Sequence, residues 1–222
     1  RLCTRVHNPS GDRYHGPCGS GHIIHGEANT SMPNTHALLA LCFDLGDTIM
    51  DEGTELKDAT GTTLEAALIP GMADLLRELK TRGHAIAIVA DSRPNTPPNV
   101  LRRHGLLGLF DTLSISEVVG VSKPEPRMFT SALAALGIPA ADYSRVVMVG
   151  NNLERDIAGA NRLGLISVFF HWNERRRTTP ETKDETPDYT VHSAQELRAL
   201  LAYLDRPTPS SRLRQAATTL RR

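Results

Sequence analysis

Apolar residues in this chain form short runs that alternate with segments of helical repeat. The runs cover residues 38–43, 85–90, 112–115, 146–149 and 165–170. Such runs are typical of strands buried on both faces of a sheet. Between the first two runs, Met72, Leu75, Leu76 and Leu79 recur at helical spacing after Pro70-Gly71, which predicts a helix ending at Gly83. Similar patterns predict helices over residues 100–107, 127–136, 153–163 and 194–204.

Alternating strands and helices predict an α/β fold with a parallel sheet covered on both faces. We therefore expect a three-layer, Rossmann-like sandwich. The strand at 38–43 should be central, flanked by those at 85–90 and 146–149. The glycine-rich dinucleotide fingerprint Gly-x-Gly-x-x-Gly does not follow the first strand.

The two ends of the chain differ from the alternating region at 34–204, which we predict to be the folded domain. Residues 1–33 begin with Arg and contain scattered histidines and glycines without any period. We predict a disordered leader or an upstream or non-native segment, with Met32 as a candidate start. Residues 205–222 contain five arginines, which predicts a basic, disordered tail.

Composition excludes several classes of partner. The 222 residues carry a formal net charge of zero, so we expect neither nucleic acid nor an acidic membrane surface as a partner. No apolar run approaches the length of about 20 residues that a membrane span needs. The three cysteines, Cys3, Cys18 and Cys42, have no regular spacing. A disulfide framework is not expected, and we predict a cytoplasmic protein. The oligomeric state stays open.

Polar residues that can carry chemistry follow the predicted strands. Asp44 ends the first strand, where an unpaired buried carboxylate would be costly for packing. Ligands of open α/β sheets bind beyond the carboxyl ends of the strands, so this position suits a functional residue. Four further candidates follow later strands or precede a helix: Asp91, Ser92, Lys123 and Asp156, with Asn151 and Asn152 beside the last of them.

These segments resemble the motifs of the haloacid dehalogenase-like (HAD) hydrolase superfamily. The first is Asp44-Leu-Gly-Asp-Thr48, similar to the family's Asp-x-Asp-Gly-Thr. The most specific are Lys123-Pro-Glu-Pro126 and, about 25 residues later, Gly150-Asn-Asn-Leu-Glu-Arg-Asp156. The resemblance covers nearly all of residues 38–204.

The resemblance implies a phosphohydrolase in which Asp44 attacks phosphorus and forms an aspartyl-phosphate. Lys123 would neutralise the phosphoryl oxygens and stabilise the developing charge. The implied phosphate-binding or substrate-binding set is Asp91, Ser92, Lys123 and Asn152. The implied Mg²⁺ ligands are Asp44, the carbonyl of Gly46, Asn151 and Asp156, which are the oxygen donors that Mg²⁺ prefers.

Three positions depart from the family pattern. Gly46 replaces the acid that protonates the leaving oxygen, a contribution of roughly 10²–10⁴ in rate. Asp47 follows one place later and is the candidate replacement. Asn151 replaces the first acid of the metal loop, so Mg²⁺ affinity should fall. Ala90 stands where the family has Ser or Thr, with Ser92 two residues later.

The intervals between Thr48 and Pro70 and between Ser92 and Lys123 are too short for a sizeable cap domain. We therefore expect an open site. Within this superfamily, a core without a cap resembles the members that act on large substrates or recruit another chain as a lid. The substrate would be a phosphorylated small molecule or macromolecule.

Several interpretations remain open. The principal one is a Mg²⁺-dependent phosphohydrolase, either active or weakly active. The alternatives are a catalytically impaired binding or scaffold module, and metal-independent dehalogenase or phosphonatase chemistry. A cluster from His171 to Arg177 holds Trp172 and three arginines, which indicates either an anion-binding or base-stacking surface or a solvated loop with one packed aromatic.

Overall fold

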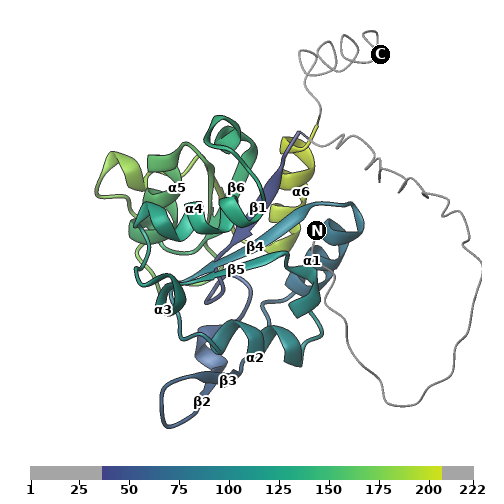
Figure 1. Ribbon diagram of the computed structural model, residues 1–222, viewed down its shortest axis with the longest axis vertical. Coiled ribbons are helices and arrows are strands. Elements are labelled where there is room, and N and C mark those ends of the chain that lie inside the picture. Colours follow the sequence, from purple (N-terminus) through teal and green to yellow (C-terminus); the bar gives the residue numbers. More distant parts are fainter. Residues whose placement is uncertain (1–36, 207–222) are drawn as a thin grey trace, which may run out of the picture. The chain divides into compact units, whose positions relative to one another are not determined.

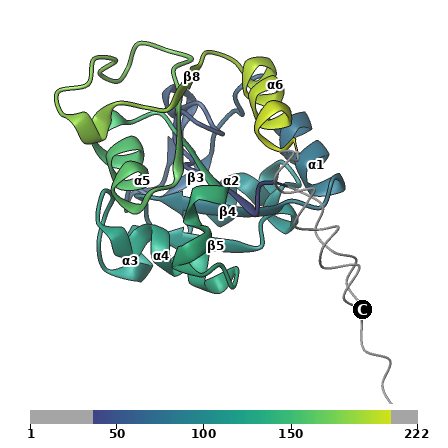
Figure 2. The ribbon, with the colours of Figure 1, turned by 90° about the horizontal axis from the view of Figure 1, so that it is seen from above.

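The structure is a computed structural model that describes residues 37–206 (Figures 1 and 2). The predicted leader at 1–33, almost all of the predicted tail, and Cys3 and Cys18 lie outside the described residues. One six-stranded sheet has the order β5-β4-β1-β6-β7-β8, and all of its neighbouring strands pair in parallel. Its strands are β1 (Ala40–Phe43), β4 (Ala85–Ala90), β5 (Thr112–Ile115), β6 (Val146–Gly150), β7 (Ile166–Phe170) and β8 (Tyr189–Val191).

The predicted α/β fold is confirmed, with β1 between β4 and β6. The α-helices are α1 (Met72–Thr81), α2 (Thr96–Arg103), α3 (Ser116–Val119), α4 (Pro126–Ala135), α5 (Ala158–Leu163) and α6 (Ala194–Leu204). None of the helices described is long and apolar enough to cross a membrane.

Alternation along β1 divides the core into two layers. Leu41 and Phe43 point to one face, where they join buried residues of α1, α2 and α6. Ala40 and Cys42 point to the other face, where they join buried residues of α4 and α5. Figure 1 shows α4 and α5 on one side of the sheet and α1 and α6 on the other. Cys42 is a buried free cysteine whose pKa burial raises to about 12, so it packs as a small apolar residue.

Two predicted helices differ from those observed. Helix α2 begins at Thr96 instead of 100, because Pro97 and Pro98 fit the first helical turn, where no intrahelical N–H bond is lost. It ends before Gly105, which has a φ of 65°, and Leu107–Leu109 form a separate 3₁₀ turn, η2. The helix expected at 153–163 starts instead as a π-helical turn, η4 (Leu153–Ile157), before α5.

The segment between β1 and α1 is small. It contains a 3₁₀ turn, η1 (Glu52–Thr54), and an antiparallel hairpin of β2 (Leu56–Lys57) and β3 (Thr63–Glu65). The segment between β4 and α4 contains α2, the 3₁₀ turn η2, β5 and α3. The carboxyl ends of β1, β4 and β6 are therefore covered only by short elements.

Candidate active site

A cavity of about 600 Å³ lies at the carboxyl ends of β1, β4 and β6. Its predicted lining residues are Asp44, Gly46, Asp91, Ser92, Lys123, Asn151, Asn152 and Asp156. It is also lined by residues that the sequence analysis did not single out, among them Glu52, Glu55, Ser116 and Arg155, and by Arg176 of the cluster at 171–177. Of the predicted site residues, Asp47 alone does not line it.

Lys123 contacts the carboxylates of Asp44 and Asp156, which lie far apart in the sequence. Its Nζ atom donates hydrogen bonds to Asp44 Oδ1 at 2.6 Å, Asp156 Oδ1 at 2.7 Å and the carbonyl of Val89 at 2.8 Å. Burial acts to lower the pKa of Lys123, but Asp156, Asp44 and Asp91 raise it above its ordinary value. The ammonium group is therefore held charged between the ends of β1, β4 and β6.

Asp44 directly follows β1, and its backbone N–H donates to the carbonyl of Val149 at 2.9 Å, so the strand register fixes its position. The residue is 9% exposed. Lys123 engages its Oδ1 atom from within the cavity wall. A carboxylate with this placement can attack a bound electrophile from the cavity floor.

Asp156 approaches the sheet across Gly150. A Cβ atom at Gly150 would lie 2.3 Å from Asp156 Cγ, so only glycine leaves room for this carboxylate. Asp156 Oδ2 also accepts from the N–H of Asn152 at 3.0 Å. Burial raises the pKa of Asp156 to about 7; the Lys123 ammonium opposes the shift and the Asp44 carboxylate adds to it.

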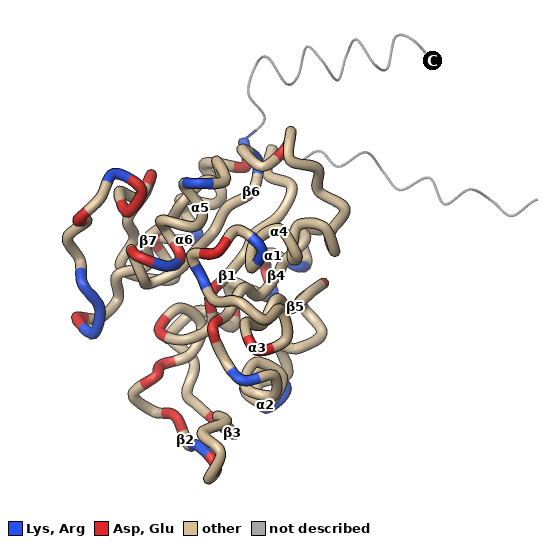
Figure 3. Tube along the Cα trace, turned by 60° about the vertical axis from the view of Figure 1, so that its left-hand side comes forward, with Lys and Arg blue, Asp and Glu red and all other residues tan. Residues whose placement is uncertain are grey.

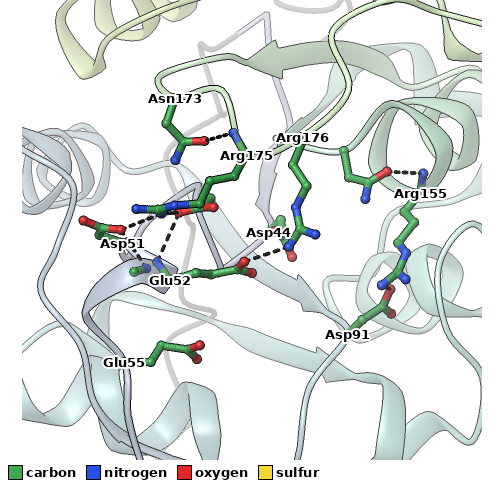
Figure 4. Close-up of polar contacts among 12 residues, drawn as sticks. Asp44, Asp51, Glu52, Glu55, Asp91, Arg155, Asn173, Arg175 and Arg176 are labelled. Carbon is green, nitrogen blue, oxygen red and sulfur yellow. Dashed lines mark hydrogen bonds and ion pairs between the residues drawn. The ribbon is translucent and has the colours of Figure 1, made fainter.

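Glu52 fills the space above Gly46. An ideal Cβ atom at Gly46 would lie only 2.1 Å from Glu52 Oε1, whereas the backbone of Gly46 is outside the positive-φ region. Glu52 Oε2 pairs with Arg176 Nη2 at 2.7 Å. Burial raises the pKa of Glu52 and Arg176 opposes the shift, while the nearby Asp47, Asp44 and Glu55 add to it. Figure 4 shows the Glu52 carboxylate pointing toward Asp44.

Asp47 is fully buried, with a φ of 48°, and has a different set of partners. Its Oδ1 accepts from the N–H of Glu52 at 3.1 Å and pairs with Arg175. Its carbonyl accepts from Trp172 Nε1 at 2.9 Å. These contacts tie the loop after β1 to the loop after β7, and the geometry does not bring Asp47 to the cavity.

Asp91 and Ser92 line the cavity but also hold its walls together. Asp91 Oδ1 accepts from the N–H of Lys123 at 2.9 Å, and Asp91 Oδ2 lies 3.4 Å from Arg155 Nη1. The N–H of Ser92 donates to Ser116 Oγ at 3.0 Å. Asp91 thus positions the segment that carries Lys123, and Ser116 is a further hydroxyl in the cavity wall.

Asn151 and Asn152 follow β6. Asn152 Oδ1 accepts from the N–H groups of Glu154 and Arg155 and so begins η4. Asn151 is buried, and its Nδ2 atom has no hydrogen-bond partner among the described residues. A buried side-chain amide with a free polar atom at the cavity wall is suited to a bound ligand.

The cluster at 171–177 proves to be mainly an ion-paired loop. Trp172 packs on the core, with Arg175 above its ring, as the solvated-loop interpretation expected. Arg175 also pairs with Asp51, and Arg177 pairs with Glu154 and Glu185. Acidic and basic residues are interspersed along the trace (Figure 3). Arg176 is the arginine of this loop that lines the main cavity.

Comparison with known proteins agrees with this geometry. The sequence model of the haloacid dehalogenase-like hydrolases matches residues 17–164. The Escherichia coli pyrimidine 5'-nucleotidase YjjG is 40% identical over 134 residues, which are 60% of this chain and 56% of that protein. The ribulose-1,5-bisphosphate 5-phosphatase of Halopiger xanaduensis is 35% identical over 142 residues, 62% of this chain and 58% of that one.

An (S)-2-haloacid dehalogenase of Pseudomonas sp. strain YL is 33% identical over 154 residues, 67% of this chain and 62% of that one. The chain thus spans little more than half the length of these curated relatives.

Among solved structures, an HAD phosphatase from Thermococcus onnurineus has a TM-score of 0.60 at 21% identity, covering 74% of this chain and 98% of that one. The putative HAD hydrolase YfnB from Bacillus subtilis, solved with bound magnesium, has a TM-score of 0.59 at 19% identity. The match covers 74% of this chain and 98% of that one. The fold, the cavity and the matched family model agree: the chain belongs to the haloacid dehalogenase-like hydrolases.

Proposed function

We propose that the protein is a Mg²⁺-dependent phosphohydrolase that forms an aspartyl-phosphate on Asp44. The observation that carries the proposal is the position of Lys123, whose ammonium bonds both Asp44 and Asp156 in one open cavity. A phosphate dianion approaches a carboxylate only if positive charge offsets the repulsion. The Lys123 ammonium, 2.6 Å from Asp44 Oδ1, supports this proposal because it offers such a charge next to the carboxylate.

Different residues of the chain would carry out different steps of the reaction. An Asp44 carboxylate oxygen attacks phosphorus, and the bond between phosphorus and the leaving oxygen breaks. Lys123 stabilises the phosphoryl oxygens, and Ser92 and Asn152 lie on the walls that would face them. A water molecule then attacks phosphorus, phosphate leaves, and the carboxylate of Asp44 is restored.

The residues present fit a Mg²⁺ ion of modest affinity. Asp44 and Asp156 offer carboxylate oxygens, Asn151 an amide oxygen and Gly46 a backbone carbonyl, and Mg²⁺ usually keeps several waters beside one or two carboxylates. No cluster of three or more His, Cys, Asp or Glu side chains suited to a metal occurs in residues 37–206. When bound, the ion would neutralise phosphoryl charge and help to orient the substrate.

The open cavity and the relatives support a proposal for the substrate class. The named activities of two relatives concern a nucleotide and a sugar bisphosphate. We propose a phosphorylated small molecule as the substrate, with a phosphorylated macromolecule as the alternative that an uncapped cavity also admits.

A dehalogenase is the second candidate function. Gly46 provides no acid beside Asp44, and a relative 33% identical to this chain is named as a haloacid dehalogenase. In that case Asp44 would displace halide from carbon, which needs no protonation of the leaving group.

Both candidates can be tested on one panel. The protein with Mg²⁺ is assayed on aryl, acyl and alkyl phosphates, on pyrimidine 5'-nucleotides and sugar bisphosphates, and on 2-chloropropionate. We expect slow, Mg²⁺-dependent phosphate release that Asp44→Asn abolishes. Halide release without Mg²⁺ would favour the dehalogenase, and no turnover of any compound would favour a binding module.

A further inference from the structure

The position of Glu52 has a consequence for the reaction. An ideal Cβ atom at Gly46 would lie 2.1 Å from Glu52 Oε1, so the carboxylate occupies the space where a side chain at position 46 would begin. Glu52 lies six residues after Gly46 in the sequence, and Asp44 lies two residues before it. Both line the same cavity. A carboxyl group therefore reaches the space beside the nucleophile from a different point in the chain.

Two contacts of Glu52 itself, and one within its turn, hold it in this place. Its N–H donates to Asp47 Oδ1 at 3.1 Å, which fixes the backbone at the start of η1. Asp51 Oδ1 accepts from the N–H of Gly53 at 2.9 Å and begins the same turn. Arg176 pairs with Oε2, which leaves Oε1 as the oxygen nearest Gly46. Figure 4 shows Arg176 reaching this carboxylate from the loop after β7.

We propose that Glu52 is the general acid and base for Asp44, in place of a carboxyl group at position 46. The proposal rests on the proposed phosphohydrolase function. As Asp44 attacks, the bond from phosphorus to the leaving oxygen breaks, and that oxygen takes the proton of Glu52. The resulting Glu52 carboxylate then takes a proton from the attacking water. The bond from phosphorus to Asp44 breaks with its electron pair returning to the carboxylate, and phosphate leaves.

The obstacle to an acid at position 46 is thus the Glu52 side chain, not the backbone. Gly46 lacks a positive φ, so Gly46→Asp is compatible with the main chain. Its Cβ atom would nevertheless overlap Glu52 Oε1. A side chain at position 46 and the Glu52 carboxyl group in its present place would occupy the same space, so Glu52 would have to move aside.

The experiment compares Glu52→Gln with the unmodified protein on an alkyl phosphate and on an aryl phosphate with a good leaving group. We expect at least about a 100-fold loss of kcat on the alkyl phosphate, since general acid catalysis contributes about 10²–10⁴. The aryl phosphate should still release its phenol in a burst, because this leaving group departs without a proton. Phosphorylated protein should then accumulate, because water is no longer activated.

Glu55→Gln is the matched control, since it neutralises another carboxylate lining the same cavity. It should leave the ratio of alkyl to aryl turnover unchanged. Glu52→Asp, which keeps a shorter carboxyl group, should recover part of the alkyl activity. Circular dichroism establishes that each variant is folded. The double variant Glu52→Ala/Gly46→Asp should exceed Glu52→Ala on the alkyl phosphate by about tenfold or more.

The outcomes separate the two proposals. If Glu52→Gln and Glu52→Asp both hydrolyse alkyl phosphates like the unmodified protein, Glu52 is not the acid, and the phosphohydrolase stands. An equal loss with alkyl and aryl phosphates, without phosphorylated protein, would likewise overturn the role of Glu52. If the unmodified protein itself never becomes phosphorylated, the proposed function fails and the role of Glu52 fails with it.

Discussion

At the scale of single residues, the site is built around one buried cation. Lys123 is 5% exposed and donates three hydrogen bonds: to Asp44 after β1, to the carbonyl of Val89 in β4, and to Asp156 in η4. Removal of one partner from a buried charge pair leaves an uncompensated charge, which costs far more than loss of an exposed pair. The same residue therefore contributes both to stability and to the proposed chemistry.

Urea denaturation can compare the loss of this buried charge with the loss of a partly exposed one. Lys123→Met should lower the free energy of unfolding by about 3 kcal/mol, because Asp44 and Asp156 lose their counter-charge. The control is Lys80→Met, which removes a partly exposed pair with Asp111 and should cost less than about 1 kcal/mol. Equal effects for the two variants would contradict the assigned environment of Lys123.

Asn151 determines how strongly the proposed metal binds. Its amide can offer an oxygen but no charge, and hard-cation affinity depends on the number of charged ligands. Asn151→Asp should therefore tighten Mg²⁺ binding by about tenfold in calorimetry. Asn152→Asp is the adjacent control; Asn152 accepts two backbone bonds in η4, so we expect a smaller change. No Mg²⁺ binding to either the native protein or Asn151→Asp would contradict the metal site.

At the scale of elements, the site depends on how each strand ends. Strand β6 ends with Gly150, and the absent side chain lets the π-helical turn η4 bring Asp156 against the sheet. The loop after β1 is held by Asp47, Trp172 and Arg175, which keep η1 and Glu52 beside the cavity. Local backbone shape thus places the carboxyl groups.

Gly150→Ala tests this dependence. The new Cβ atom would lie 2.3 Å from Asp156 Cγ, so the carboxylate must move. A displacement near 1 Å can cost about 100-fold in rate, and we expect a loss of kcat of that order. Gly108→Ala is the control, because a Cβ atom there meets nothing within 4 Å. Unchanged phosphatase activity in Gly150→Ala would show that the position of Asp156 is not needed.

At the scale of the whole molecule, the sheet could be predicted from sequence because its apolar runs are buried on both faces. The strand β8 was missed, since it is short and two of its three residues are exposed. Asp44 and the segment that carries Asp156 follow β1 and β6, and these strands are neighbours in the sheet, so the strand order brings the two residues to the same edge. Glu52 could not be foreseen in this way, because η1 and its contact with Gly46 depend on tertiary packing between two loops.

The most direct test of the central claim is to trap the covalent intermediate. The protein is mixed with Mg²⁺ and an aryl or acyl phosphate, quenched with acid, and reduced with borohydride, which converts an aspartyl-phosphate to homoserine. Peptide mass spectrometry should find homoserine at position 44, and none in Asp44→Asn. Turnover of the phosphate without modification at position 44, or modification that persists in Asp44→Asn, would contradict the assignment of Asp44 as the nucleophile.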